Sequence, residues 1–290
     1  MSRILVMGST GMLGFSIKSE LLTRGSDLFW TRRSQSSQTD SREYLLDIRN
    51  DDLKTWFRDK PKFDYVINCI GAIPQKYVQG SESHIREMIE LNTLLPKILN
   101  ELSDSHGFRT IQIATDCVFE GTSSKYSEDS LHDAIDLYGV TKSLGEKYSS
   151  DAMLIRCSII GKNDATNSSL HNWLLAQGRD STVNGYKNHL WNGITTLAFA
   201  RIVSGIIEDT LYTPGIQHIL PSDEVTKYQL LEIIAEVNGR LDLHIMPADH
   251  EMTIDRTLTS LYLERNELLW ASAGYENVPS ISELVREMDA

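Results

Sequence analysis

The chain has 290 residues, 41% of them hydrophobic, which is enough apolar material for a substantial core in one or two domains. Its formal net charge is −12, so it has no basic excess to displace counterions from a nucleic-acid backbone, and we expect no nucleic-acid partner. The three cysteines, Cys69, Cys117 and Cys157, show no Cys-x-x-Cys or zinc-type Cys/His spacing. We therefore predict reduced thiols and no metal site.

The sequence contains no pattern typical of a targeting signal or a membrane span. Only four apolar residues, 4–7, separate Arg3 from Gly8, and that run is too short for either. No later run approaches ~18 apolar residues. We expect a cytoplasmic protein with no membrane partner.

Short apolar runs alternate with helical patterns through the first half of the chain. The runs predict strands at 4–7, 27–31, 44–46, 65–69, 110–114 and 153–157, and the patterns predict helices at 12–24, 51–59, 83–103 and 138–149. Pro96 lies inside the third helical pattern, where we expect a kink or a break. The alternation predicts an α/β fold, a doubly wound parallel sheet of the Rossmann type that binds ligands beyond the carboxyl ends of its strands.

A glycine-rich turn joins the first predicted strand to the first predicted helix. Gly8, Gly11 and Gly14 follow the spacing G-x-x-G-x-x-G, which lets the backbone turn tightly and approach a pyrophosphate at the helix N-terminus. A purely structural turn is the alternative. The position between a strand and a helix favours dinucleotide binding.

The residues after the second and third strands bear on the choice of cofactor. An NAD site usually offers a carboxylate to the ribose, whereas here the second strand ends in Arg32 and Arg33. Two guanidiniums can hold a 2′-phosphate, so we expect NADP to be preferred over NAD, with two solvated surface arginines as the alternative. Asp47 and Ile48 are candidates to contact the adenine, the first by a hydrogen bond and the second by packing.

Tyr138 and Lys142 form the strongest catalytic signal. On a helix, positions i and i+4 share one face, so the phenol and the ammonium can converge. An ammonium beside a phenol lowers a pKa that starts near ~10, which makes the tyrosine usable as a proton donor or acceptor. Thr115, at the end of the fifth strand, is a candidate to bind a carbonyl oxygen, although a lone strand-end threonine is more often structural.

Together these motifs resemble those of the extended short-chain dehydrogenase/reductases. The match rests on Gly-x-x-Gly-x-x-Gly at 8–14, Thr-Asp-x-Val-Phe-x-Gly at 115–121 and Tyr-Gly-x-Thr-Lys-x-x-Gly-Glu at 138–146. Within that superfamily the chain is similar to the dTDP-4-dehydrorhamnose reductases, which reduce the 4-keto group of sugar nucleotides. The resemblance covers most of the chain and is closest up to about Gly161.

The resemblance implies a mechanism. NADPH gives a hydride to C4 of a nucleotide-activated 4-keto-6-deoxy sugar, Tyr138 donates the proton, Lys142 lowers the tyrosine pKa and holds the nicotinamide ribose, and Thr115 orients the carbonyl. The implied cofactor-binding residues are Gly8, Thr10, Gly11, Met12, Leu13, Gly14, Arg32, Arg33, Asp47, Ile48, Cys69, Ile70, Gly71, Tyr138 and Lys142. The implied substrate-binding residues are Asp116, Cys117, Lys187, Trp191 and Arg256.

Two departures from the family pattern lie near the expected sugar. Ala114 and Cys117 stand where the family usually has serine and tyrosine, and Ile159 stands where a tryptophan is common. The identity of the hexose, the nucleotide base and the stereochemistry at C4 therefore stay open.

The C-terminal part predicts a smaller α/β substrate domain. We place the Rossmann domain at 1–162 and the substrate domain mainly at 163–290, with a return to the first domain at about 186–213. For Lys187 the alternatives are a phosphate contact or a surface hairpin, and for Arg256 a pyrophosphate contact or an ion pair with Asp255. Helices are predicted at 170–177, 195–208 and 228–237.

Two other functions share this fold. A sugar-nucleotide epimerase or dehydratase would retain bound NAD, and the arginines after the second strand argue against it. A non-catalytic regulatory subunit, resembling the β subunit of methionine adenosyltransferase, would have no need of the intact Thr/Tyr/Lys set. A homodimer is the assembly that we consider, and the oligomeric state stays open.

Overall fold

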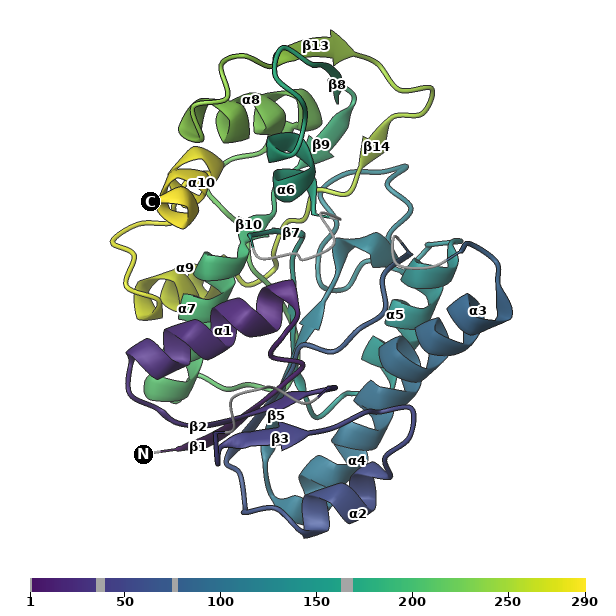
Figure 1. Cartoon of the computed structure of the whole chain (residues 1–290), viewed down its shortest axis with the longest axis vertical. Coiled ribbons are helices and arrows are strands. Elements are labelled where there is room, and N and C mark those ends of the chain that lie inside the picture. Colours follow the sequence, from purple (N-terminus) through teal and green to yellow (C-terminus); the bar gives the residue numbers. More distant parts are fainter. Residues whose placement is uncertain (1, 35–39, 75–77, 163–168) are drawn as a thin grey trace.

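The computed structural model describes residues 2–34, 40–74, 78–162 and 169–290, and Figure 1 shows them arranged as two lobes. The larger lobe contains a seven-stranded sheet of order β11-β6-β5-β4-β1-β2-β3, in which every neighbouring pair is parallel. Its strands are β1 (Arg3–Met7), β2 (Asp27–Arg32), β3 (Glu43–Leu45), β4 (Tyr65–Asn68), β5 (Arg109–Ala114), β6 (Met153–Arg156) and β11 (Gly215–His218). The predicted Rossmann-type fold is confirmed.

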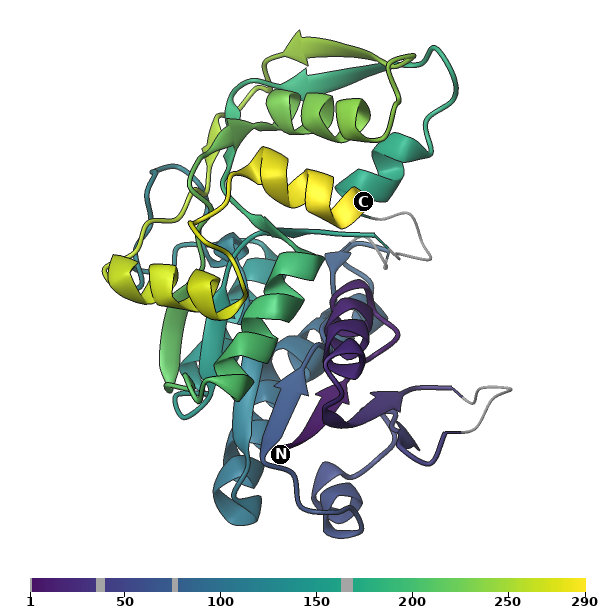
Figure 2. The same cartoon turned by 90° about the vertical axis from the view of Figure 1, so that its left-hand side faces the viewer.

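Helices cover both faces of this sheet because both faces of its strands are apolar. Along β1, Ile4 and Val6 pack into one core and Leu5 and Met7 into another, as the alternation of a strand requires. The first core is covered by α1 (Met12–Thr23), α7 (Thr196–Glu208) and α9 (Leu263–Ser272), and Figure 2 shows α1 and α7 side by side. The opposite face carries α2 (Leu53–Arg58), α3 (Glu82–Ile89), α4 (Leu95–His106) and α5 (Leu137–Lys147).

The helix predicted at 83–103 is interrupted near Pro96, as expected. Helix α3 ends at Ile89, a π-helical turn occupies Glu90–Leu94, and α4 starts at Leu95 with the proline in its first turn. Proline has no N–H and its ring clashes with the preceding turn, so the regular hydrogen-bond ladder is replaced there. This π-helical turn contains Asn92, which is buried.

Among the described residues, the smaller lobe contains two short sheets and three helices. Strand β8 (Thr182–Tyr186) pairs with β13 (His244–Ala248), and β9 (His189–Trp191) lies between β12 (Val225–Thr226) and β14 (Ile254–Asp255). The helices are α6 (Leu170–Leu175), α8 (Lys227–Val237) and α10 (Ile281–Asp289), which share one apolar core. Since β8 and β9 belong to different sheets, the surface hairpin considered for this segment is not formed.

The chain returns to the larger lobe after the smaller one has begun. Strands β7 (Ile159–Ile160) and β10 (Ile194–Thr195) pair in parallel, and α7, within the predicted return segment, then packs against α1. Strand β11 and helix α9 also join the larger lobe, so the return extends beyond 213. The predicted boundary after 162 meets residues 163–168, which lie outside the described residues. Within the described ranges, no helix has the length and apolar character needed to cross a membrane.

Candidate active site

The predicted catalytic residues lie where strands of the parallel sheet end. Thr115 follows β5 directly, and α5 carries Tyr138 and Lys142 along the same edge. Helix α5 starts at a defined place because the Asp136 side chain accepts a hydrogen bond from the Gly139 amide at 3.0 Å. A Cβ atom at Gly139 would overlap the Cys117 carbonyl oxygen, so α5 packs directly on the turn that follows β5.

That turn is a short 3₁₀ segment, η3 (Asp116–Val118), and Thr115 is its N-cap. The Thr115 hydroxyl accepts a hydrogen bond from the Cys117 amide at 3.1 Å and donates one to Asp116 Oδ1 at 3.3 Å. The Tyr138 side chain lies close enough to Thr115 for this hydroxyl to influence its pKa. The structure therefore brings Thr115 and Tyr138 together, as a site that binds one carbonyl oxygen with both groups requires.

The protonation of Tyr138 differs from the expectation. Burial raises the pKa of Tyr138, and the nearby Asp116 and Asp136 carboxylates raise that pKa further, while the Thr115 hydroxyl opposes the rise in part. Burial dominates because a phenolate loses more hydration than a neutral phenol does. Without bound ligands, Tyr138 is a neutral phenol at physiological pH, which suits a proton donor.

Lys142 projects from the next turn of α5 toward the loop that follows β4. A Cβ atom at Gly71 would lie 3.3 Å from both Lys142 Nζ and Asn92 Oδ1. Burial lowers the pKa of Lys142, and the nearby Glu146 carboxylate opposes that shift. Burial also raises the pKa of Cys69 to about 12, so this thiol is uncharged. The lysine thus lies between the catalytic helix and the predicted cofactor loop.

Asn92 is a site residue that the sequence analysis missed. Its Oδ1 accepts a hydrogen bond from the Ala72 amide at 2.9 Å, and its Nδ2 donates to the Ala72 carbonyl at 3.0 Å and to Thr141 Oγ1 at 3.3 Å. An added Cβ at Gly145 would overlap the Asn92 carbonyl oxygen, so α5 is also pressed against the π-helical turn. The available signal was an asparagine in a helical pattern four residues before a proline, but the partners of Asn92 are distant in sequence.

The glycine turn has the shape that a pyrophosphate requires. Gly8 has a φ of +80°, and a Cβ at Gly14 would overlap the Gly8 carbonyl oxygen, so helix and strand approach more closely than other residues allow. Gly11 is the N-cap of α1 and provides no side-chain acceptor, which leaves the helix N-terminus for an external anion. Thr10 is exposed, Met12 is half-buried and Leu13 is buried in the core.

The two arginines after β2 have different environments. Arg32 Nη1 lies 3.5 Å from Glu43 Oε1, while its Nε is buried and has no hydrogen-bond partner among the described residues. Arg33 is exposed. A buried guanidinium N–H without a hydrogen-bond partner could bind an anionic group such as a 2′-phosphate. The ion pair with Glu43, however, partly neutralises Arg32.

The candidates for adenine contact lie on the loop that follows β3. Asp47 accepts hydrogen bonds from Arg49 and Asn50, and the contact with Arg49 lowers the pKa of Asp47. Ile48 packs on the core beneath α2 and α4. Both residues therefore have partners within the protein, and their contact with adenine stays a prediction.

On the substrate side, Arg256 reaches the catalytic turn from the smaller lobe. Its Nε donates to the Phe119 carbonyl at 2.7 Å, and its Nη1 lies 3.9 Å from Cys117 Sγ. Asp255 bonds to the Thr257 amide and hydroxyl instead, and no ion pair joins it to Arg256 within the described ranges. The ion pair that we considered as the alternative is therefore not formed.

The backbone around Arg256 is tied to the loop after η3. The Asp255 amide donates to the Gly121 carbonyl at 2.9 Å, the Tyr126 amide to the Thr257 carbonyl at 3.0 Å, and the Thr259 amide to the Tyr126 carbonyl at 2.8 Å. The smaller lobe thus closes one side of the catalytic turn.

The other two substrate candidates lie in contrasting places. Lys187 Nζ lies 3.4 Å from Asp249 Oδ2, both side chains are more than half exposed, and no contact within the described part of the chain joins Lys187 to the catalytic turn. Trp191 is buried, and its Nε1 donates to Ser158 Oγ at 2.8 Å. Lys227, which the sequence analysis missed, places its ammonium 5.3 Å from the centre of the Trp191 ring.

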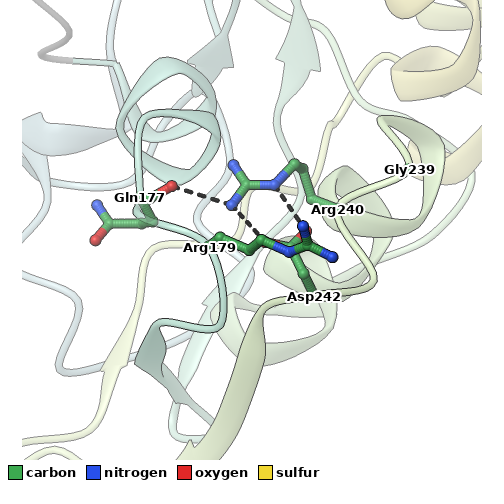
Figure 3. Close-up of a pocket in the computed structure, with 5 residues that line it drawn as sticks. All are labelled: Gln177, Arg179, Gly239, Arg240 and Asp242. Atoms are coloured by element: carbon green, nitrogen blue, oxygen red, sulfur yellow. Dashed lines mark hydrogen bonds and ion pairs between the residues drawn. The ribbon is translucent and has the colours of Figure 1, made fainter.

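Two surface hollows lie outside this group of residues. The one in Figure 3 is lined by Gln177, Arg179, Gly239, Arg240 and Asp242. Arg240 there binds Asp242 with two hydrogen bonds of 2.9 Å and donates to the Leu175 carbonyl at 2.6 Å, so it holds the end of α6. A second hollow of about 530 Å³ lies along α3 and the π-helical turn. Neither contains a predicted site residue.

Comparison with known proteins places these features in context. A family model described as RmlD substrate binding domain matches residues 1–257. Methionine adenosyltransferase 2 subunit beta from Xenopus tropicalis is 25% identical over 276 residues, which cover 86% of this chain and 76% of that protein.

Two solved structures are similar in fold over almost the whole chain. A dTDP-4-dehydrorhamnose reductase from Clostridium acetobutylicum has a TM-score of 0.79 and 22% identity, covering 99% of this chain and 98% of that one. The corresponding enzyme from Bacillus anthracis, determined in complex with NADP, has a TM-score of 0.79, 18% identity and the same coverage of 99% and 98%. At these identities the likeness establishes the fold.

Proposed function

The chain belongs to the RmlD substrate binding domain family, which confirms the resemblance inferred from its motifs, and we propose that it is an NADP-dependent reductase of a nucleotide-activated 4-keto-6-deoxy sugar. The observation that carries the proposal is the grouping of Thr115, Tyr138 and Lys142 at the sheet edge. The Thr115 hydroxyl lies near enough to Tyr138 to influence its pKa, and Lys142 lies against Gly71. The solved relative bound to NADP has the same fold.

In the proposed reaction, the cofactor supplies the hydride and the protein manages the carbonyl oxygen. The Thr115 hydroxyl and the Tyr138 phenol both donate to that oxygen, and as the hydride reaches C4 the phenol transfers its proton to the developing alkoxide. The Lys142 ammonium then stabilises the phenolate that remains. In the unliganded site Tyr138 is protonated, as a proton donor must be at the start of this reaction.

The residues proposed to hold the cofactor follow the same edge of the sheet. The backbone of the glycine turn and the N-terminus of α1 would hold the pyrophosphate, and Arg32 with Arg33 would hold the 2′-phosphate. Lys142 would hold the nicotinamide ribose beside the loop 69–71. NAD is the alternative cofactor, since Glu43 competes for Arg32.

A regulatory subunit is the second candidate because the chain is similar over 276 residues to methionine adenosyltransferase 2 subunit beta. An epimerase or dehydratase that keeps its NAD bound is the third. The grouping of Thr115, Tyr138 and Lys142 favours the reductase over a pure binding subunit, since binding alone does not need a proton donor at this position. We also propose that the protein is cytoplasmic and forms a homodimer. Light scattering would establish the oligomeric state.

The deciding experiment is a spectrophotometric screen of NADPH oxidation. The purified protein is offered 4-keto-6-deoxy sugars carried by dTDP, UDP or GDP, with Tyr138→Phe as the control. Oxidation by the native protein that the variant lacks would support the reductase. NADPH binding without oxidation of any substrate would support the regulatory subunit, and stoichiometric NAD in the purified protein would support the epimerase.

A further inference from the structure

Arg156, the last residue of β6, is fully buried and contacts three separate segments of the chain. Its Nη2 donates to the Glu146 carboxylate of α5 and lies 2.8 Å from His132 Nε2, in the loop that leads into α5. Its Nη1 lies 3.0 Å from His218 Nε2, at the end of β11. The N–H groups of a guanidinium point in fixed and different directions, so one side chain can join elements that are distant in sequence.

The guanidinium sets the tautomer of both histidines. Because it only donates hydrogen bonds, both Nε2 atoms accept, and each ring carries its proton on Nδ1. The Nδ1–H group of His132 then donates to Ser143 Oγ of α5 at 2.7 Å. The Nδ1–H group of His218 donates to the Thr259 carbonyl at 2.6 Å. Burial lowers the pKa of both rings, which keeps them neutral and able to accept at physiological pH.

On the catalytic helix, these contacts hold the stripe of residues that contains the proton donor. Tyr138, Lys142 and Glu146 are each four residues apart, so they follow one another along one face of α5. Lys142 and Glu146 are both buried. A bond to Glu146 therefore fixes the rotation of α5 about its axis and, with it, the directions in which Tyr138 and Lys142 point.

The other end of the network supports the segment that carries Arg256. Thr259, whose carbonyl binds His218, lies three residues after Arg256 in the chain. The next residue, Ser260, donates through its hydroxyl to Glu128 at 2.6 Å, and Glu128 belongs to the loop between the catalytic turn and α5. The segment on the substrate side is thus fastened to β11 and to the loop that leads into the catalytic helix.

Phe119 provides a second route between the two arginines. The Arg156 guanidinium carbon lies 5.2 Å from the centre of the Phe119 ring, and Arg256 Nε donates to the Phe119 carbonyl at 2.7 Å. Phe119 is also the C-cap of η3, the turn that Thr115 begins. A displacement of Arg156 therefore reaches the catalytic helix, the catalytic turn and the substrate side together.

We propose that Arg156 is a positioning residue for the reaction, because it binds Glu146, His132 and His218 at once and so fixes the catalytic helix relative to the segment that carries Arg256. Arg156 has no exposed surface and acts through these neighbours. The part of the proposal that concerns turnover rests on the proposed function. Replacing a buried ion pair by apolar residues is often neutral or stabilising, so stability alone does not account for such a network.

Arg156→Lys tests the role because it keeps a positive charge opposite Glu146. Its ammonium is a single nitrogen, which cannot reach acceptors on three segments in the directions that a guanidinium does. We expect kcat for NADPH oxidation to fall by ~10-fold or more, since a misplacement of ~1 Å can cost ~10²-fold. NADPH affinity should not change. Arg109→Lys is the matched control, since Arg109 begins β5 at the opposite edge of the sheet, and it should retain the wild-type kcat.

Two substitutions of His218 provide a rescue test. Glutamine offers both an acceptor to Arg156 and a donor to the Thr259 carbonyl, whereas leucine offers neither. His218→Gln should therefore retain more of the wild-type kcat than His218→Leu, measured well below the melting temperature of each variant. If the network acted only on stability, the two variants would have equal kcat at that temperature, and the proposal would be wrong.

Hydrogen exchange tests the connection without turnover. In Arg156→Lys, backbone amides should exchange faster both in α5 and in 255–261, while those of α1, on the opposite face of the sheet, should be unchanged. Faster exchange in neither segment, or in α5 alone, would overturn the proposal.

A folded Arg156→Lys protein with the wild-type kcat would also overturn it, because the arginine would then only stabilise the fold. If Arg156→Lys does not fold, the two His218 variants decide by the same measurements of kcat and exchange. If the wild type oxidises NADPH with no sugar nucleotide, the reductase fails, and the exchange still decides whether Arg156 joins the two segments.

Discussion

Removing the hydroxyl of Tyr138 separates catalysis from binding in this site. In Tyr138→Phe the ring stays in place and only the phenol oxygen is lost. The Thr115 hydroxyl keeps its contacts with the Cys117 amide and with Asp116, so the structural cost is at most that of one hydrogen bond, ~0.5–1.5 kcal/mol. The catalytic cost is larger, because general acid catalysis contributes ~10²–10⁴-fold, or ~3–5.5 kcal/mol of barrier.

The assay compares kcat for NADPH oxidation with NADPH affinity, measured separately by fluorescence titration. We expect kcat to fall by ~10²–10⁴-fold while NADPH affinity and melting temperature change little. Tyr148→Phe is the matched control, since Tyr148 ends the same helix and its side chain is 49% exposed. Its activity should equal that of the wild type.

The pH profile tests the same reasoning independently. Because burial raises the pKa of Tyr138, the phenol keeps its proton through neutral pH, and kcat/KM, which reports the free enzyme, should show no decline caused by the phenol until pH exceeds ~10. A Tyr138→Phe protein with kcat within ~3-fold of the wild type would refute the role of the phenol as the proton donor.

Three further predictions address the cofactor, the substrate and the buried core. Replacing Arg32 and Arg33 with serine should weaken NADPH at least ~10-fold more than NADH in titrations, and equal losses would place both arginines outside the cofactor site. Arg256→Ala should raise the sugar-nucleotide KM by ~10-fold or more while kcat changes less, and an unchanged KM would place the diphosphate elsewhere. Burial, aided by Arg156, lowers the pKa of His218 to about 4, so only the unfolded state gains this proton between ~6.5 and 4. The free energy of unfolding should therefore decrease as the pH is lowered from ~6.5 to 4, by up to ~1.36 kcal/mol per pH unit. A flat profile in denaturant titrations across this range would contradict the prediction.

Local patterns in the sequence were sufficient for the parts of the fold that depend on neighbouring residues. The six strands read from apolar runs, the glycine turn and the break near Pro96 are all present. Strand β11 was missed because Gly215–His218 is short and half polar, and only its pairing with β6 makes it a strand. Its place depends on a partner about sixty residues earlier in the chain.

In the candidate site, too, features that depend on neighbouring residues could be predicted, and features that depend on distant residues could not. Tyr138 and Lys142 share one helix face, so their spacing was sufficient to pair them. Lys187 is close to Trp191 in sequence but follows a strand of another sheet, whereas Lys227 lies over the Trp191 ring because β12 pairs with β9, and sequence spacing does not report that contact. The direction of the tyrosine pKa depended on burial, which spacing alone does not report.

The backbone contacts between 121–126 and 255–259 limit how far this protein can be treated as two exchangeable modules. The catalytic turn belongs to the larger lobe by sequence, yet Arg256 bonds to its Phe119 carbonyl and the segment around Thr257 supports the loop behind it. A graft that exchanged the smaller lobe for that of a relative would therefore replace part of the wall around the reacting carbon along with the substrate contacts. Substrate preference and reaction rate should then change together, and recombination points that preserve activity would have to keep both segments from the same parent.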